Sequence, residues 1–288
     1  MITYSKKEFI KELKTLWHET FGDSEQYLNA FFESVYKGEN TLVYIKDKRV
    51  VSALYIIPYT MLYKGREIKV AYLYALATNP AYRGRGIMGE LIERSFEICK
   101  SRGYSLITLI PSEHSLFGYY ERFGFKAIFS RTVITKDINE AENIALNHSP
   151  IKLKKCDADM IFNAYRQSEF YKSGCVRINK EQNFFYVNEL IRESGTAAVF
   201  DMNGKNDGYI LFSTDEEKLV IYESNVNESF LGALYAALAK DYTFKLIEHI
   251  QPICFEKVEI MAAEKPFAMA KSFEKLCISN PFINRVLT

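Results

Sequence analysis

The residues best suited to chemistry form one turn rich in glycine and arginine, residues 79–89, between a β-rich run and a helical pattern. The first N–H groups of a helix have no intrahelical carbonyl to bind, so together with the helix dipole they attract anions. Gly84 and Gly86 would let the backbone approach a phosphate, and Arg83 and Arg85 would add positive charge. The turn therefore favours a phosphate or pyrophosphate ligand, although plain surface connections also have this composition.

Strand and helix patterns surround this turn on both sides. Apolar residues recur at helical spacing near the N-terminus, alternate or cluster as in strands before the turn, and return to helical spacing after it. A short, fully apolar run follows, as expected for a strand buried on both faces. The predicted elements are helices at 5–17 and 24–35, strands at 41–46, 50–58 and 68–78, a helix at 87–102, a strand at 104–110, a helix at 115–122 and a strand at 125–133.

Two motifs at this spacing resemble those of the GNAT superfamily of N-acetyltransferases. Arg83 and Gly86, directly after a strand, are similar to the Arg/Gln-x-x-Gly-x-Gly/Ala loop of that family. Thirty-four positions beyond Gly86, residues 120–125 look like its Tyr-x-x-x-Gly-Phe segment. A helix and a buried strand separate the two motifs, as the GNAT fold requires. The resemblance covers residues 40–130 well and the rest of the chain loosely.

One departure from the loop pattern narrows the resemblance. The last Gly/Ala position of the loop is Met88 here, and Gly89 follows one step later. With Ser112 and Glu113 ahead of the second motif, and a second GNAT-like half, the chain resembles the enhanced-intracellular-survival (Eis) type of acetyltransferase. That type usually carries a third, sterol-carrier-like domain, for which residues 265–288 leave no room.

The resemblance implies acetyl-CoA as the acyl donor, bound without a metal. The strand before the turn would bind the pantetheine arm through its main chain, the turn would hold the pyrophosphate, and the end of the buried strand would lie beside the pantetheine. The implied residues are Leu76, Ala77 and Thr78 on the strand, Arg83, Gly84, Arg85, Gly86, Ile87, Met88 and Gly89 in the turn, and Ser112 and Glu113 after the buried strand.

The same resemblance places Tyr120 near the cofactor sulfur. A tyrosine, with an ordinary pKa of about 10, stays protonated and can donate a proton to a leaving thiolate. Tyr119 competes for this role, and a plain core aromatic residue is the alternative for Tyr120. A main-chain N–H at Ala77 or Thr78 could stabilise the oxyanion.

The general base is left open by the sequence. Many GNAT enzymes carry an acidic residue on the strand before the loop, but residues 70–79 contain none. Glu113 and His114 are the nearest titratable residues, and the Eis type uses its C-terminal carboxylate, here that of Thr288. Water could also take the proton.

The resemblance to GNAT proteins implies that the two opening helices form one wall of the acceptor site. Acidic residues there could favour a cationic amine, or they could form an ordinary solvated face. These residues are Glu19, Asp23, Glu25 and Glu33.

Composition excludes several other classes of protein. The 37 Lys and Arg residues nearly balance the 36 Asp and Glu residues, so no overall positive field attracts nucleic acid or a membrane surface. The five cysteines are scattered without a Cys-x-x-Cys pair, which fits neither a disulfide framework nor a metal site. We find no signal or spanning segment and expect a cytoplasmic protein; homo-oligomer formation is left open.

The length of 288 residues predicts two domains. We expect an α+β protein with a mixed sheet: two GNAT-like domains in tandem, each a mostly antiparallel sheet with flanking helices. Residues 1–137 would be catalytic, 138–150 a polar linker, and 151–288 a second domain with a C-terminal tail. The second domain repeats the order of elements but lacks the Arg/Gly turn, so we expect it to be non-catalytic.

The sequence thus favours an acetyl-CoA-dependent N-acetyltransferase that acts on a primary amine of a small molecule or peptide by direct attack on the thioester. Two alternatives stay open. An acyl-CoA-binding regulatory module would bind the cofactor without turnover. A tandem-GNAT aminoacyl transferase would draw on charged tRNA, but the near-zero net charge disfavours a nucleic-acid partner.

Overall fold

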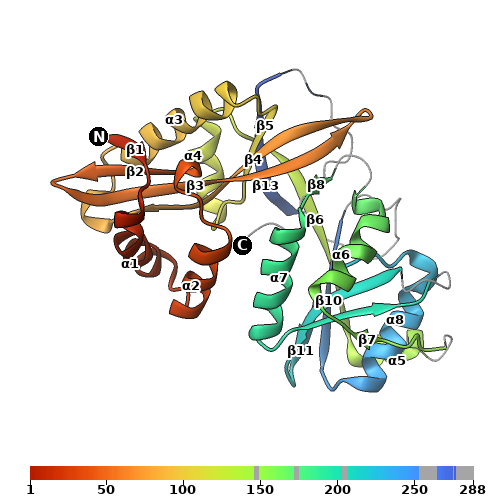
Figure 1. The fold of residues 1–288 in the computed structure, drawn as a ribbon. Coiled ribbons are helices and arrows are strands. Elements are labelled where there is room, and N and C mark those ends of the chain that lie inside the picture. The colour runs from red at the N-terminus through yellow and green to blue at the C-terminus, as the bar shows by residue number, and fades with distance from the viewer. Residues whose placement is uncertain (146–148, 172–174, 203–206, 253–264, 275, 277–288) are drawn as a thin grey trace. The chain divides into compact units, whose positions relative to one another are not determined.

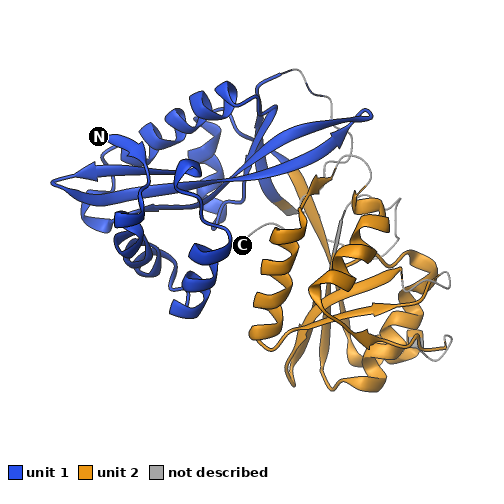
Figure 2. Ribbon diagram, in the orientation of Figure 1, with its two compact units in different colours: residues 1–128, 267–278, 287–288 blue, residues 129–266, 279–286 orange. Residues whose placement is uncertain are grey.

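The computed structural model describes residues 1–145, 149–171, 175–202, 207–252, 265–274 and 276 (Figure 1). It divides into two compact units (Figure 2). Unit 1 comprises Met1–Ile128 and the segment that begins at Phe267, and unit 2 comprises most of the chain from Phe129 to Pro266.

A mixed sheet forms the centre of unit 1. Strands β1 to β4 run antiparallel to one another, and β4 and β5 run parallel. The late strand β13 pairs antiparallel with β5. In spatial order the strands are β1 (Ile2–Tyr4), β2 (Thr41–Lys46), β3 (Arg49–Tyr63), β4 (Arg66–Thr78), β5 (Leu106–Leu109) and β13 (Lys265–Ser272).

Helices cover both faces of this sheet. Helices α1 (Ile10–Phe21) and α2 (Glu25–Ser34) lie on one face, and α3 (Ile87–Ser101) and α4 (Phe117–Glu121) lie on the other (Figure 1). Trp17 of α1 packs against Phe31 of α2 and against Tyr55 and Tyr74 of the sheet. Short 3-10 turns at Lys7–Phe9, Gly38–Asn40, Pro80–Tyr82 and His114–Leu116 connect these elements.

Strand β4 has an irregularity that opens the sheet. Tyr74 pairs with Tyr55 and Ala77 pairs with Ala53, so two residues of β4, Ala75 and Leu76, lie opposite one residue of β3. Ala75 has a φ of 46°, an unusual conformation for a residue with a side chain. Such a bulge bends a strand and ends regular pairing.

The pairing of β4 with β5 stops just before this bulge. It runs from Val70 opposite Leu106 to Tyr72 opposite Thr108, although β4 continues to Thr78. The two parallel strands therefore separate at their carboxyl ends, where parallel sheets bind ligands.

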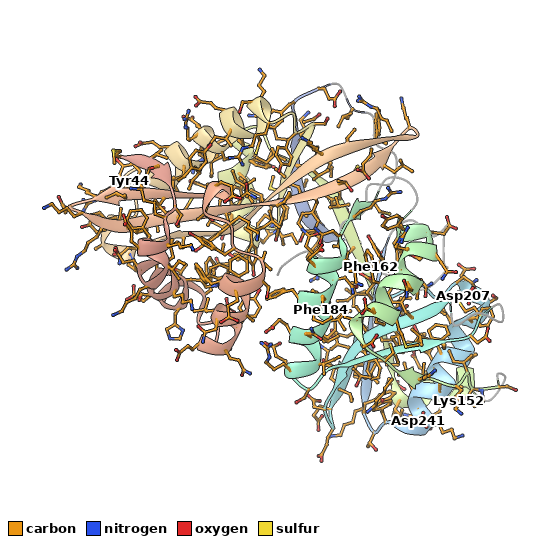
Figure 3. All side chains as sticks on the ribbon, in the orientation of Figure 1. Tyr44, Lys152, Phe162, Phe184, Asp207 and Asp241 are labelled. Carbon is orange, nitrogen blue, oxygen red and sulfur yellow. The ribbon has the colours of Figure 1, made fainter. Side chains whose placement is uncertain are left out.

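The strands of unit 2 also form a mixed arrangement, with helices of their own. In spatial order its strands are β6 (Lys126–Asp137), β12 (Leu246–Pro252), β11 (Lys218–Ser224), β10 (Gly208–Thr214), β9 (Thr196–Phe200) and β7 (Lys154–Lys155). Among these described strands, β11 and β12 run parallel and the other neighbours run antiparallel. The remaining elements are α5 (Ile138–Ala145), α6 (Ala158–Gln167), a 3-10 turn at Glu169–Tyr171, β8 (Val176–Arg177), α7 (Lys180–Arg192) and α8 (Glu228–Asp241). On α7, the labelled side chain of Phe184 is half exposed (Figure 3).

The mixed α/β class with flanking helices is confirmed, but the division of the chain differs from our expectation in two ways. Residues 138–145 of the predicted linker are helix α5, whose Ala141 is fully buried while Ile138 and Ile144 pack on the core of unit 2. These three residues recur at helical spacing among polar neighbours, which hid the helix in the sequence. In addition, β13 returns from the C-terminal region to the sheet of unit 1.

None of the helices in the described ranges is long and apolar enough to cross a membrane.

Candidate functional site

The turn before α3 exposes the start of that helix. Gly84 and Gly86 have φ values of 73° and 78°, in the left-handed region that favours glycine. A Cβ atom added at either position would meet no other atom within 4 Å, so the backbone faces open space. Gly86 is the N-cap residue of α3, and no side chain caps the helix there. The first amides of α3 are therefore accessible to a ligand.

Side chains of the turn stabilise it by hydrogen bonds to main-chain atoms of the same segment. The Arg83 Nε donates to the Thr78 carbonyl at 2.9 Å, and the Arg85 Nη2 donates to the Ala81 carbonyl at 3.0 Å. Asn79 Oδ1 accepts the Ala81 amide at 3.1 Å and starts the 3-10 turn. These contacts fix the turn while both guanidinium groups keep their charge beside it.

The turn borders a first cavity of about 460 Å³. Among the described residues, its charged lining consists of three arginines, Arg83, Arg85 and Arg122, without an acidic residue. The lining set is Thr78, Tyr82, Arg83, Gly84, Arg85, Gly86, Ile87, Met88, Gly89, Tyr119, Arg122 and Phe123. Three cations and a free helix N-terminus make this cavity suited to an anion.

Gly89 is constrained for a different reason. An added Cβ atom would lie 3.2 Å from the Phe123 ring, closer than ordinary contact. Glycine at this position therefore allows α3 to pack closely against the segment after α4, while Met88 packs partly against the core.

A second cavity, of about 330 Å³, lies where β4 and β5 separate. It is lined from β4 and its bulge, from the segment after β5, from α4, and from the end of α1. The lining residues are Trp17, Phe21, Asp23, Tyr72, Leu73, Tyr74, Ala75, Leu76, Ile110, Ser112, Leu116 and Tyr120. Leu76 in this cavity and Thr78 in the first are two positions apart on β4, so the strand connects the two cavities.

Tyr120 presents the strongest candidate acid in the second cavity. Burial raises the pKa of Tyr120 well above its ordinary value, and the neighbouring Tyr119 adds to this effect. Among the described residues, none forms a hydrogen bond with the Tyr120 hydroxyl, which keeps it available as a donor. Tyr119 lines the first cavity instead, with the Arg122 guanidinium 4.8 Å from its ring centre.

The structure brings most of the predicted site residues together. Three of them, Leu76, Ser112 and Tyr120, line the second cavity. Eight more line the first cavity: Thr78, Arg83, Gly84, Arg85, Gly86, Ile87, Met88 and Gly89. Ala77 and Glu113 line neither. Ala77 is buried on the other face of β4, because side chains alternate between faces along a strand. Its carbonyl accepts a hydrogen bond from Ser52 Oγ at 2.8 Å.

The residues considered as the base either do not line the two cavities or lie outside the described residues. Glu113 is exposed and accepts a hydrogen bond from Ser115 at 3.1 Å, while the His114 ring packs against Phe117. Neither lines a cavity. Thr288 lies outside the described residues. In the described ranges, no group of three or more side chains is placed to hold a metal ion.

Of the four acidic residues proposed on the opening helices, Asp23 alone lines the second cavity. Asp23 Oδ2 accepts a hydrogen bond from Trp17 Nε1 at 2.6 Å. The sequence analysis missed the aromatic lining around it, from Trp17, Phe21, Tyr72 and Tyr74. Tyr72 and Tyr74 are two positions apart on β4, which predicts that both side chains lie on one face of the strand. The sequence does not show that α1 packs on that face.

Comparison with known proteins agrees with this geometry. Residues 1–128 match the family described as an acetyltransferase (GNAT) domain. No curated protein matches the sequence.

Several solved structures share the fold over most of the chain. A probable N-acyltransferase from Enterococcus faecalis V583 matches with a TM-score of 0.77 and 16% identity, covering 94% of this chain and 72% of that one. A GCN5-related N-acetyltransferase from Anabaena variabilis matches with a TM-score of 0.76, 16% identity and the same coverage. Eis1 from Mycobacterium abscessus matches with a TM-score of 0.71 and 14% identity, covering 94% and 73%. The predicted resemblance to GNAT proteins, including the Eis type, is thus confirmed at the level of fold.

Proposed function

We propose that this protein, whose residues 1–128 match the family described as an acetyltransferase (GNAT) domain, is an acetyl-CoA-dependent N-acetyltransferase acting on a primary amine of a small molecule or peptide. The observation that carries this proposal is the open, arginine-lined cavity at the start of α3, joined along β4 to a second cavity that contains Tyr120. A donor molecule with a diphosphate at one end and a thioester at the other matches this arrangement.

The first cavity suits the nucleotide end of the donor. Main-chain amides at the start of α3 would bind the pyrophosphate, and Arg83 and Arg85 would add charge. The absence of a side chain at Gly84 and Gly86 leaves the space that the phosphates need. The pantetheine arm would follow β4 past Thr78 and Leu76 toward the second cavity.

The second cavity suits the transfer itself. The amine nitrogen attacks the thioester carbon; a C–N bond forms, the C–S bond breaks, and the Tyr120 hydroxyl protonates the departing thiolate. The amine gives up its proton to water, and solvent then restores the Tyr120 proton. Since burial raises the pKa of Tyr120, it carries the proton that this step needs at neutral pH.

We propose a tandem arrangement in which unit 2 is a second GNAT-like domain without catalytic function. The order of elements supports this: two helices, three antiparallel strands, a helix and a parallel strand occur in unit 2 as in unit 1. We also propose a cytoplasmic location, in keeping with the free thiols of Cys99, Cys156 and Cys175.

Two measurements on the full chain test the proposal. Thermal unfolding with and without acetyl-CoA reports binding, and a ligand at 100 times its Kd stabilises a protein by about 2.7 kcal/mol. Thiol release from acetyl-CoA in the presence of polyamines, aminoglycosides, arylalkylamines and lysine peptides reports turnover. We expect stabilisation by acetyl-CoA and turnover with at least one amine class.

The outcomes separate the alternatives. Stabilisation without turnover for every amine class would favour the acyl-CoA-binding module and reject the enzyme. If acetyl-CoA does not stabilise the protein and no free thiol is released from it, both functions are rejected.

A further inference from the structure

Among the residues that the structure describes, Asp23 is the one charged residue in the lining of the second cavity. This residue lies between α1 and α2, and Trp17 Nε1 donates to its Oδ2 atom at 2.6 Å. Among the described residues, no lysine, arginine or histidine side chain pairs with the Asp23 carboxylate. A carboxylate without a cationic partner at the wall of a cavity is a binding group for a cationic ligand.

Aromatic rings surround this carboxylate. Trp17 lies with its ring centre 6.1 Å from that of Phe21 and 5.3 Å from that of Tyr74, and Tyr72 stacks on Tyr74 at 5.7 Å. All four rings line the cavity, and Phe21, 41% exposed, forms its rim. Aromatic faces attract cations and pack well against flat or apolar bodies.

The size and polarity of the cavity limit what it can hold. A volume of about 330 Å³ is at the lower end of the range of roughly 300–1,000 Å³ for small-molecule sites. The rings offer few partners for the many hydroxyl groups of a sugar, and a polyamine would bring further ammonium groups that no second carboxylate of the described lining meets. The lining thus matches one ammonium and one apolar body.

We infer that the acceptor substrate is a compact primary amine with a single ammonium group on an aromatic or apolar body. This inference rests on the proposed function, since it names the substrate class of the same site. The ammonium is drawn to Asp23 and the body lies among Trp17, Phe21, Tyr72 and Tyr74. Tyr120 lines the same cavity, so the amine, once it has lost a proton to water, is within reach of the thioester.

The chain contains a single tryptophan, Trp17, which makes the binding measurable without acetyl-CoA. We propose titrating the full chain with 2-phenylethylamine while recording tryptophan fluorescence. The anion 3-phenylpropanoate, with a similar ring and opposite charge, and the polyamine spermidine serve as comparison ligands. We expect a saturable change in fluorescence with 2-phenylethylamine at concentrations at least about tenfold below those needed for either comparison ligand.

Asp23→Asn removes the charge while keeping an oxygen that can accept the hydrogen bond of Trp17. We expect it to weaken 2-phenylethylamine binding about tenfold to a hundredfold, as for loss of a charged hydrogen bond, and to raise KM for the amine more than it lowers kcat. Glu19→Gln is the matched control, since Glu19 is exposed near the end of α1, four positions before Asp23, and does not line the cavity. Unchanged near-ultraviolet circular dichroism would show that Asp23→Asn is folded.

Each result decides a separate question. Equal binding of 2-phenylethylamine by the Asp23→Asn and Glu19→Gln variants overturns the inference, as does a preference for spermidine. Acetyl transfer to amines that leave Trp17 fluorescence unchanged would also overturn it, while the proposed function stands. Amine binding that depends on Asp23, with no transfer from acetyl-CoA, would instead reject the proposed function and keep the binding site.

Discussion

Replacing Tyr120 with phenylalanine tests the proposed acid directly. The ring of Tyr120 is buried and packs against Tyr119 and Phe125, with ring centres 5.2 Å and 6.1 Å away, and phenylalanine keeps both contacts. No described residue loses a hydrogen bond, because none binds the Tyr120 hydroxyl. The change in the free energy of unfolding should therefore stay below about 1 kcal/mol.

The effect on turnover should be much larger. Loss of a positioned general acid costs about 10²–10⁴-fold in rate, which corresponds to roughly 2.7–5.4 kcal/mol in the barrier. Burial raises the pKa of Tyr120 well above that of an exposed tyrosine, so the wild-type protein keeps its acid across the usual assay range. We therefore expect kcat to fall by about 10²-fold or more at every pH from neutral to mildly alkaline.

The assay is thiol release from acetyl-CoA with the best amine, alongside the acetyl-CoA dissociation constant from thermal unfolding. Tyr119→Phe is the control, because Tyr119 lines the first cavity and was the rival for the same role. We expect this control to keep most of its kcat. A fully active Tyr120→Phe variant refutes the reasoning, and a large loss in Tyr119→Phe alone would transfer the role to that residue.

Two further predictions concern the turn and unit 2. Gly86→Val should abolish stabilisation by acetyl-CoA in thermal unfolding, because it forces a branched side chain into the φ of 78° that opens the turn; Gly103→Val, at a φ of 73° away from both cavities, imposes a similar strain and should keep the stabilisation. Burial lowers the pKa of His249 from 6.5 to about 3. Between pH 3 and pH 6.5 this imidazole is therefore protonated in the unfolded chain and neutral in the folded chain. The stability that His249 contributes is fully present above pH 6.5 and is lost as the pH falls toward 3, by about 2 kcal/mol at pH 5 relative to pH 7.5. Urea unfolding followed by circular dichroism should show this loss in the wild type and less of it in His249→Gln, and equal pH dependence in both would contradict the assignment.

The sequence predicted the elements around the turn because local signals agree there. A strand, a turn with glycine at two left-handed positions, and an amphipathic helix are each specified by nearby residues. The predicted strand 68–78 ends where β4 ends, and the predicted helix 87–102 differs from α3 by one residue. The two units differ from the predicted division because α5 packs three apolar residues of a polar stretch on the core of unit 2, and because β13 pairs with β5 from the far end of the chain.

The candidate site was predictable only where one segment supplies it. The residues of the first cavity come mainly from the turn itself. The second cavity requires α1, β4 and α4 to meet, and no local pattern shows that Trp17 reaches Tyr74. The bulge at Ala75 is likewise invisible in the sequence, since alanine gives no sign of a φ of 46°.

Similar strands in the two units have different surroundings. In unit 2, β10 and β11 also shift register near Ile221 and Glu223, and β11 pairs with β12 only as far as His249. The space beyond is filled by side chains, because Ser224 Oγ lies 2.9 Å from His249 Nε2 and Tyr235 lies 3.1 Å from Nδ1, all three buried.

The turn before α8 is closed in a related way. Asn225 accepts the Tyr209 amide and donates to the Asp207 carbonyl, both at 2.7 Å, and the first turn of α8 carries the acidic Glu228. At the start of α8 an anion would therefore encounter a hydrogen-bonded loop and a negative charge, whereas the start of α3 in unit 1 has glycines and arginines. The difference in function that we propose between the units therefore rests on a few residues after one strand in each unit, and much less on the order of the elements.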